Sequence, residues 1–506
     1  MANVDAFKEH IIAGNTFKGD SITVGAAMLD GETITGAHVK IPLKTLNRHG
    51  LIAGATGTGK TKSLQVLAEN LSEKGIPVLL MDMKGDLSGI AKASEGHPKI
   101  DERHEKIGLP FTAKGFPVEI LTLSEQDGTR LRATVSEFGP VLFSRIIDAS
   151  ESQAGIIAIL FKYCDDNKLP LLDLKDFKKV LQYSTNEGRE EIQELYGRIS
   201  TASAGAILRK IVQLEQQGAD IFFGEKSFDV QDLTRLDENG YGMINILRLT
   251  DIQDKPSLFS TFMLSLLAEI YSTFPEQGDS GQPELVIFID EAHLIFKEAS
   301  KALHDQIESI VKLIRSKGIG LYFVTQNPTD VPDGVLSQLG LKIQHALRAF
   351  TAKDRKAIKL TAENYPISEF YDTTEVLTSL GIGEALVSAL DEKGRPTPLA
   401  ATMMRAPMSR MDILSQAEIN AINESSSLVK KYNDVVDRES AYELLNKKIE
   451  KAETEEVKAK AKKEREKVQR STRSRSSNTT QKAIIKVLTS ATVIRGVLGI
   501  LGKMIK

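Results

Sequence analysis

One short motif, G-x-x-x-x-G-K-T, constrains this chain more than any other part of its sequence. It spans Gly54 to Thr61 and directly follows a short apolar run at residues 51–53. Such a loop between a strand and a helix is a complete P-loop, the element that binds nucleotide phosphates. A turn rich in glycine and threonine that binds nothing would contain the same letters. We favour the P-loop because a strand signal precedes the motif and a helix signal, residues 61 to about 74, follows it.

The chemistry expected of this loop follows from its residue types. Its glycines can adopt backbone angles closed to other residues, so successive N–H groups can turn inward around phosphate oxygens. The helix that follows presents its positive end to the same anion. Lys60 is expected to reach the β- and γ-phosphates of ATP, and the Thr61 hydroxyl to bind Mg²⁺. The predicted nucleotide-binding residues of the loop are Gly54, Ala55, Thr56, Gly57, Thr58, Gly59, Lys60 and Thr61.

A second apolar run, residues 284–289, ends in Asp290 and Glu291. Any core strand can end in acids, but together with an intact P-loop the pattern indicates a Walker B element. Asp290 would hold Mg²⁺ through water, and Glu291 would orient and deprotonate the attacking water. The sequence continues with Ala292 and His293, the letters of a DEAH-box helicase, but nothing else in the chain supports that class. We interpret His293 as a residue that begins a helix rather than as a catalyst.

Four further residues are candidates for the same site. Gln326 ends the apolar run 320–325, and we predict it to be a γ-phosphate sensor because its amide can donate to phosphate and accept from water. Asp82 and Asp86 follow another buried run, and they could hold water or Mg²⁺, or start a turn and cap a helix. Arg48 precedes the first core strand, and it could point into the nucleotide site or be a solvated charge at the strand edge.

Strand and helix signals alternate through residues 49–99 and 240–411, which we predict to form an α/β core of five strands with a parallel sheet. A chain of 506 residues is too long for one ordinary core. The helical spacing of residues 100–239 predicts a mostly helical insertion, in which Asp173 or Asp176 could cap helices.

Short strand signals are expected at both borders of the core. Residues 1–48 are predicted to be a small β segment with a hairpin around Asp30 and Gly31. A second hairpin is predicted between residues 383 and 405. Residues 412–481 are predicted to be a charged helix that becomes a disordered linker. The basic stretch 458–475 could contact nucleic acid or anionic lipid, although such a stretch is usually a solvated tail.

The last segment, residues 482–506, has apolar residues spaced as on one stripe of a helix. A stripe of this kind suits a partner helix or self-association, an anionic membrane surface, or docking on the core. Three glycines weaken the helix prediction. The apolar positions are Ile484, Val487, Ala491, Ile494, Leu498, Leu501 and Ile505.

Composition limits the classes of function. The chain is 41% hydrophobic and 26% charged, with a formal net charge of −3, so nucleic acid could be contacted only through local basic patches. The single Cys164 cannot form an internal disulfide, and the N-terminus lacks a signal-peptide pattern, which together favour the cytoplasm. No apolar run reaches the roughly 18 residues needed to span a bilayer.

The order of the motifs resembles that of the HerA-like branch of the FtsK/HerA superfamily, over about residues 20 to 410. The stretches that carry the resemblance are Arg48-His49, GATGTGKT, Asp82-Met-Lys-Gly-Asp, Ile289-Asp-Glu-Ala-His, Ile314-Arg-Ser-Lys-Gly-Ile-Gly, Thr325-Gln-Asn-Pro and Gln344-His-Ala-Leu-Arg. Bacterial HerA-like proteins of unassigned role, sometimes called YjgR-like, are the most similar. The resemblance implies a RecA-like core with an inserted helical domain, a hexameric ring, and ATP-driven translocation of double-stranded DNA.

The resemblance also implies roles for individual residues. Lys60, Thr61, Asp290, Glu291 and Gln326 keep the roles argued above. Arg315 matches a family arginine that reaches the nucleotide across a subunit interface or within its own subunit, and Arg48 matches a second such position. DNA-translocating HerA proteins carry a β-barrel ahead of the P-loop, for which about 48 residues leave little room. ATP hydrolysis is therefore implied more directly than DNA translocation.

Two functions of different class follow from the sequence. The first is a Mg²⁺-dependent ATPase motor, built as a ring that acts on DNA or another polymer. The second is a nucleotide-gated scaffold or membrane-associated regulator that hydrolyses ATP without translocating DNA. The response of ATP hydrolysis to DNA distinguishes the two.

Overall fold

The computed structural model describes residues 4–278, 280–297, 301–349, 351–434, 436 and 438–473. The chain divides into two compact units, Met1–Ala441 and Tyr442–Lys506. Of the second unit, the described part is the body of helix α18 (Ala441–Arg473). Everything that concerns the site lies in the first unit.

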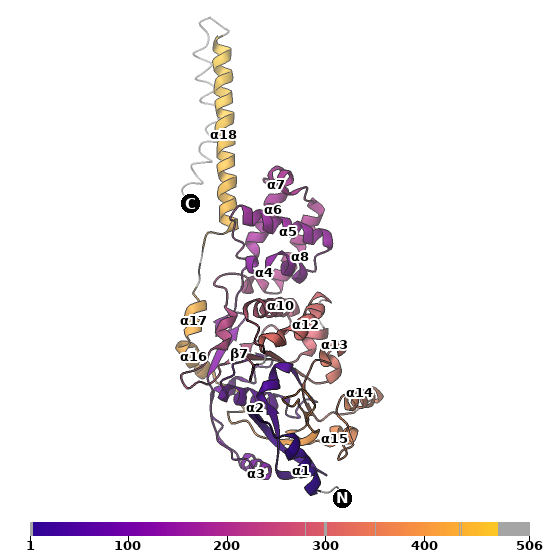
Figure 1. Ribbon diagram of the computed structural model, residues 1–506. Coiled ribbons are helices and arrows are strands. Elements are labelled where there is room, and N and C mark those ends of the chain that lie inside the picture. Colours follow the sequence, from indigo (N-terminus) through magenta and orange to yellow (C-terminus); the bar gives the residue numbers. More distant parts are fainter. Residues whose placement is uncertain are drawn as a thin grey trace. The chain divides into compact units, whose positions relative to one another are not determined.

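A twelve-stranded sheet runs through the first unit (Figure 1). Its order is β2-β1-β12-β11-β10-β3-β9-β8-β4-β7-β5-β6, and the strands from β10 to β6 are mutually parallel. The strands are β1 (Ser21–Leu29), β2 (Glu32–Pro42), β3 (Gly50–Ala53), β4 (Val78–Asp82), β5 (Val118–Thr122), β6 (Thr129–Arg130), β7 (Ile244–Arg248), β8 (Leu285–Ile289), β9 (Ile319–Thr325), β10 (Leu341–His345), β11 (Glu384–Ser388) and β12 (Ala400–Met404).

The central parallel strands are continuous apolar runs because both of their faces are covered. Every residue of β3, β8 and β9 is buried. Helix α2 (Lys60–Glu73) follows the P-loop and packs against β1, β3 and β4. The prediction of an α/β core with a parallel sheet is confirmed by this arrangement.

The prediction of a five-strand core was wrong, since the parallel part alone has eight strands and antiparallel strands extend the sheet further. β11 and β12 form the hairpin expected between residues 383 and 405, and they join the parallel part through β10. β12 then pairs with β1, and β1 with β2. The turn between β1 and β2 lies at Asp30 and Gly31 as predicted, with φ values of 52° and 83° that suit a tight hairpin.

A group of helices between β6 and β7 forms most of the stretch predicted to be a helical insertion. Figure 1 shows these helices gathered beyond helix α10 (Pro256–Thr273), against which α4 packs. Asp173 caps α6 by accepting a hydrogen bond from the Asp176 amide at 3.0 Å, as expected. Strands β5 and β6 also fall within residues 100–239 and belong to the main sheet. The helices are α4 (Val135–Ile146), α5 (Glu151–Asp166), α6 (Leu174–Thr185), α7 (Arg189–Tyr196), α8 (Thr201–Gln216) and α9 (Ala219–Phe222).

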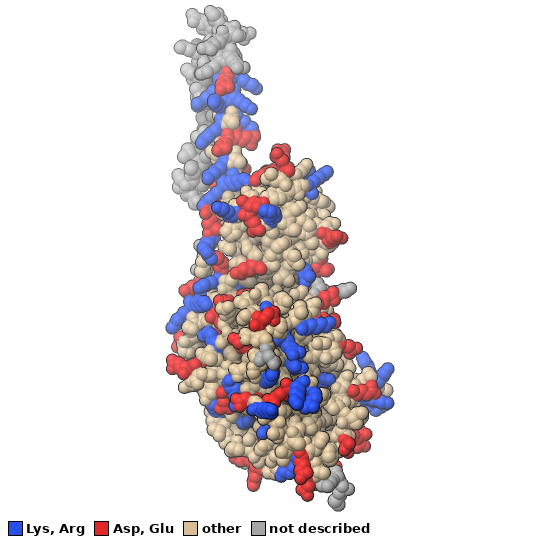
Figure 2. Space-filling view, in the orientation of Figure 1, with Lys and Arg blue, Asp and Glu red and all other residues tan. Residues whose placement is uncertain are grey.

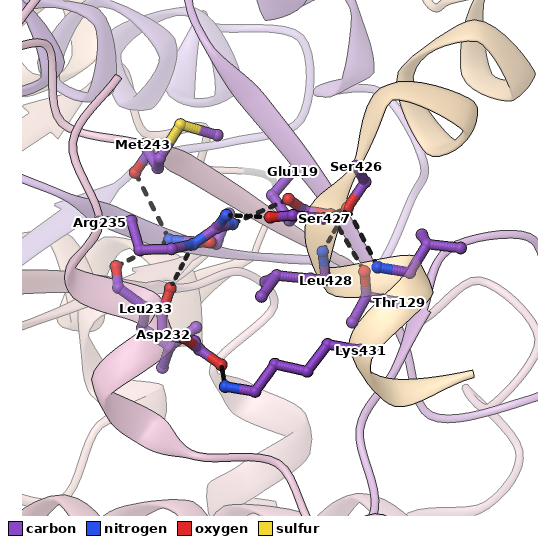
Figure 3. Close-up of polar contacts among 12 residues, drawn as sticks. Glu119, Thr129, Asp232, Leu233, Arg235, Met243, Ser426, Ser427, Leu428 and Lys431 are labelled. Atoms are coloured by element: carbon purple, nitrogen blue, oxygen red, sulfur yellow. Dashed lines mark hydrogen bonds and ion pairs between the residues drawn. The ribbon is translucent and has the colours of Figure 1, made fainter. Parts of the chain in front are cut away.

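A buried carboxylate ties the C-terminal helices of the first unit to the far edge of the sheet (Figure 3). Glu119 on β5 accepts hydrogen bonds from Thr129 Oγ1 at 3.0 Å and Ser426 Oγ at 2.5 Å. Arg235 Nη2 lies 2.8 Å from its other oxygen. Ser426 also caps helix α17 (Ser427–Tyr432), so one side chain fixes both the helix start and its place on the sheet.

Over residues 442–467, helix α18 carries Lys, Arg and Glu side chains mixed together (Figure 2), as the predicted charged helix requires. The helices that precede it are α16 (Gln416–Ser425) and α17. Within the described ranges, no helix combines the length and the apolar character needed to cross a bilayer. The predicted linker beyond residue 473 and the apolar stripe of residues 482–506 lie outside the described residues.

Candidate nucleotide site

The P-loop lies at the carboxyl end of β3, in the middle of the sheet, and neighbouring strands anchor it. The Gly54 amide donates to the Thr325 carbonyl of β9 at 3.3 Å, and the Ala55 amide to the carbonyl of Ala346, just after β10, at 2.9 Å. On the other side, the Gly383 amide donates to the Thr58 carbonyl at 2.9 Å. The loop is therefore held by its main chain and leaves its inner face to a ligand.

Two glycines have no substitute in this loop. Gly54 has a φ of 153°, and a Cβ atom built on it would lie 2.5 Å from Cβ of His345. Gly59 has a φ of 115°, and its Cβ would lie 3.2 Å from the Gly383 nitrogen. These conformations are the ones a phosphate-binding nest requires, and the residues present fit a polyphosphate.

His345 packs against the P-loop at Gly54. Its Nδ1 lies 2.8 Å from the Glu384 carbonyl, which can only accept, so Nδ1 donates and Nε2 accepts from Ser63 Oγ at 2.9 Å. Burial lowers the pKa of His345 to about 4, and the nearby Lys60 ammonium favours the same direction. The ring is therefore neutral and connects β10, β11 and helix α2.

Lys60 is buried and folds back over the P-loop. Its Nζ donates to the Gly54 carbonyl at 2.7 Å and to the Ala55 carbonyl at 3.1 Å. Burial lowers the pKa of Lys60, and repulsion from the Lys84 ammonium lowers it further. Its ammonium thus lies where a phosphate would be a stronger partner than a carbonyl.

Asp290 and Glu291 follow β8, two strands away from the P-loop strand. Asp290 Oδ2 is buried and has no hydrogen-bond partner within the described part of the chain. Burial raises the pKa of Asp290 to about 7, and the Glu291 carboxylate adds to the shift. A buried carboxylate oxygen without a donor fits a cation, so Asp290 and the Thr61 hydroxyl are suitable for Mg²⁺.

Glu291 is 7% exposed and sits in a strained backbone conformation, with a φ of 48°. Its Oε1 forms an ion pair with Lys84 Nζ. Its Oε2 lies 3.1 Å from His293 Nδ1, within ion-pair distance but without hydrogen-bond geometry. Helix α11 (His293–Lys297) begins at His293 as predicted, and the structure adds this contact with Glu291.

The two aspartates after β4 differ in environment. Asp82 accepts hydrogen bonds from the amides of Gly85, Asp86 and Leu87, at 2.7 to 3.2 Å, so it shapes the turn, one of the two interpretations left open. Burial raises the pKa of Asp82 to about 6, with Asp86 as the next cause. Asp86 Oδ1 is buried without a hydrogen-bond partner among the residues described.

Gln326 lies at the carboxyl end of β9 and is exposed. It directly follows Thr325, the residue whose carbonyl anchors Gly54. β9 is the strand between β3 and β8, so the sensor position falls between the P-loop and the Walker B acids.

Arg48 and Arg315 lie at the amino ends of the parallel strands, opposite the carboxyl ends where the P-loop and the Walker B acids lie. Arg48 precedes β3 and Arg315 precedes β9, and strands of four and seven residues place them about 13 and 23 Å along the strand direction from the carboxyl edge. Both line a cavity of about 300 Å³ together with Lys44 and Lys312. The structure therefore does not bring either arginine to the P-loop of its own chain, and Arg48 is not a nucleotide contact there.

The model of the family described as Helicase HerA-like C-terminal matches residues 28–505. The chain belongs to this family.

The relatives of this HerA-like chain include several named DNA double-strand break repair helicase HerA. The protein from Sulfurisphaera tokodaii is 25% identical over 355 residues, which are 69% of this chain and 64% of the relative. The protein from Saccharolobus solfataricus is 25% identical over 403 residues, 78% of this chain and 72% of the relative. The chain spans less than two thirds of the first relative's length.

A solved structure shows the same fold. The unbound bacterial conjugative coupling protein TrwBdeltaN70 aligns with a TM-score of 0.53 and 15% identity, covering 80% of this chain and 94% of its own. At this identity the likeness concerns the fold alone. It supports the α/β fold expected from the sequence.

Sequence reasoning missed two residues at the HerA-like site. Lys84 sits inside the stretch Asp82-Met-Lys-Gly-Asp that carried the family resemblance, and a lysine at the carboxyl end of a core strand was a usable signal. His345 ends β10, and nothing in its local sequence indicates that it packs under the P-loop, because that contact depends on strand order.

Proposed function

We propose that this chain binds ATP with Mg²⁺ and hydrolyses the β–γ phosphoanhydride bond. The observation that supports this proposal most directly is that the candidate residues all lie at the carboxyl ends of neighbouring parallel strands. The P-loop, Gln326 and the Asp290–Glu291 pair follow the adjacent strands β3, β9 and β8 at their carboxyl ends, where ligands of parallel sheets bind.

Each of these residues has a role that its geometry supports. The Lys60 ammonium, which donates to the loop carbonyls in the free protein, would donate to the β- and γ-phosphate oxygens when ATP binds. Glu291 would orient the attacking water and accept its proton, and Gln326 would bind that water and the γ-phosphate. Thr61 and Asp290 would hold Mg²⁺, which when bound neutralises charge on the phosphate oxygens.

The arginines support a ring, in which one subunit completes the site of the next. Arg48 and Arg315 are too far from their own P-loop to reach its nucleotide, and they share one cavity with Lys44 and Lys312. A cation supplied by a neighbour can stabilise the charge that develops during phosphoryl transfer. We propose a homo-oligomeric ring, a hexamer as the family resemblance implies, with Arg315 and Arg48 acting across its interfaces.

Double-stranded DNA is the proposed substrate of the motor. The support is family membership and the names of the two HerA relatives. The formal net charge of −3 provides no overall attraction for DNA, so contact would depend on local groups of Lys and Arg.

The test is ATP hydrolysis by the full-length protein, with Mg²⁺, in the presence and absence of duplex DNA, with Lys60→Ala as the control. A DNA motor should hydrolyse ATP faster with DNA, by several-fold, and Lys60→Ala should abolish both rates. A rate that does not respond to DNA would favour the nucleotide-gated regulator instead. No hydrolysis under either condition would refute the ATPase proposal itself.

A further inference from the structure

Lys84 reaches the catalytic glutamate from a neighbouring strand. It lies in the turn after β4, and Glu291 follows β8, whose residue Ile289 is paired with Met81 of β4. Because parallel neighbours end at the same edge, the turn after β4 faces the Walker B acids. The Lys84 ammonium forms an ion pair with Oε1 of Glu291, and its side chain remains 44% exposed while that of Glu291 is 8% exposed.

This ion pair engages the Glu291 carboxylate, which is the proposed general base of ATP hydrolysis. A carboxylate oxygen engaged by an ammonium is a weaker acceptor for a proton from water. The other oxygen, Oε2, lies 3.1 Å from His293 Nδ1 without hydrogen-bond geometry, so Lys84 is the stronger of the two partners. Release of Oε1 from Lys84 would therefore leave both oxygens of Glu291 available to a water.

Lys84 lies near the P-loop lysine Lys60 and near the carboxylates of Asp290, Glu291 and Asp86. The two ammonium groups are close enough to repel each other, so a phosphate held by Lys60 would also lie near Lys84. The exposed, flexible stem of Lys84 allows its ammonium to move. A nucleoside triphosphate would add the charge of its terminal phosphate between the two lysines, whereas a diphosphate would not.

We propose that Lys84 is a positioning residue that exchanges partners, from Glu291 in the nucleotide-free protein to the terminal phosphate when a nucleoside triphosphate binds. The exchange releases Glu291 only when a hydrolysable substrate is present. With a diphosphate bound, the Lys84–Glu291 pair persists and the base stays engaged. This inference rests on the proposed ATPase function and adds the means by which the site distinguishes substrate from product.

A pair of structures of the full-length protein tests the exchange directly, one with ADP and Mg²⁺ and one with ADP, Mg²⁺ and beryllium fluoride, which imitates the terminal phosphate. The expected result is that Lys84 Nζ contacts Glu291 with ADP and contacts the fluoride group with the triphosphate mimic. Retention of the Lys84–Glu291 pair in both complexes would overturn the inference.

Binding and turnover provide the functional readout. Lys84→Ala should weaken binding of a non-hydrolysable ATP analogue about tenfold and change ADP binding less than twofold. Lys84→Arg, which keeps the positive charge, should retain most of the wild-type affinity for the ATP analogue. Lys74→Ala removes another lysine, which pairs with Asp20 at the far end of α2, and should change neither affinity. Equal losses for both nucleotides in Lys84→Ala would contradict the inference while leaving the ATPase proposal intact. Wild-type protein that binds no nucleotide would refute both.

Discussion

Gly54 packs so closely against His345 that a Cβ atom on the glycine would lie 2.5 Å from Cβ of the histidine. The P-loop thus depends on a contact with a residue nearly three hundred positions later in the chain. Because His345 is itself held by Ser63 and the Glu384 carbonyl, it cannot move aside without breaking buried hydrogen bonds. The shape of the phosphate site and the packing of β10 are therefore coupled.

Gly54→Ala is expected to weaken ADP binding at least tenfold, because the new methyl group must displace His345 or the loop main chain. Isothermal titration calorimetry with ADP and Mg²⁺ measures the effect. Gly155→Ala is the control, since Gly155 lies in α5 with nothing within 4 Å of its added Cβ. Unchanged ADP affinity in Gly54→Ala would show that the loop does not need this close approach.

Two buried histidines are expected to lower the free energy of unfolding as the pH falls below about 6.5. Burial lowers the pKa of both His49 and His345 to about 4, below the value near 6.5 of an unfolded histidine. Protons therefore bind the unfolded chain first, and each histidine removes about 1.4 kcal/mol of unfolding free energy per pH unit between 6.5 and 4.

Urea unfolding at several pH values measures this dependence. Other buried groups also titrate, so the informative quantity is the difference in slope between wild type and His345→Asn, whose amide can still donate to the Glu384 carbonyl. The variant should be less sensitive to acid over this range. Parallel curves for the two proteins would mean that His345 is not buried in its neutral form.

Glu119→Ala is expected to lower the free energy of unfolding by about 2–3 kcal/mol, because it leaves Arg235 and two hydroxyls without their shared acceptor. Thermal unfolding gives the change. Glu102→Ala, which removes a carboxylate from an exposed ion pair with Lys106, should leave the melting temperature unchanged. Similar melting temperatures for the two variants would show that the Glu119 cluster contributes little.

Arg315→Ala should lower turnover roughly 10³-fold while ATP affinity changes little, if the arginine acts on a neighbour's nucleotide. Mixing it with Glu291→Gln subunits tests the shared site. In a mixed ring, an intact Glu291 from one variant can meet an intact Arg315 from the other, so activity should partly return. No recovery at any mixing ratio would count against Arg315 acting in trans.

Much of the fold could be predicted because it depends on local signals. The apolar runs that became β4, β8 and β9, the P-loop helix and the turn at Asp30 all follow from residue type and spacing. The size of the sheet could not be predicted, because the pairing of Gly25 with Met404 joins segments far apart in the chain. Short strands such as β5, within a stretch that otherwise reads as helical, give little local indication of a place in the sheet.

The same distinction applies to the site. Asp290, Glu291 and Gln326 could be proposed from the sequence because each lies at the end of an apolar run. The positions of Arg48 and Arg315 follow from strand direction, since both precede strands whose carboxyl ends carry the proposed nucleotide-binding residues. That Lys84 meets Glu291 depends on β4 lying beside β8, which only the strand order reveals.

The most direct test of the central claim is the rate of phosphate release from ATP by wild-type protein and by Glu291→Gln, both at saturating ATP and Mg²⁺. Loss of the general base should slow hydrolysis by about 10²-fold or more. ATP binding should be retained in the variant, because Lys60 and the P-loop are intact. Hydrolysis by Glu291→Gln at the wild-type rate would contradict the assignment of this site.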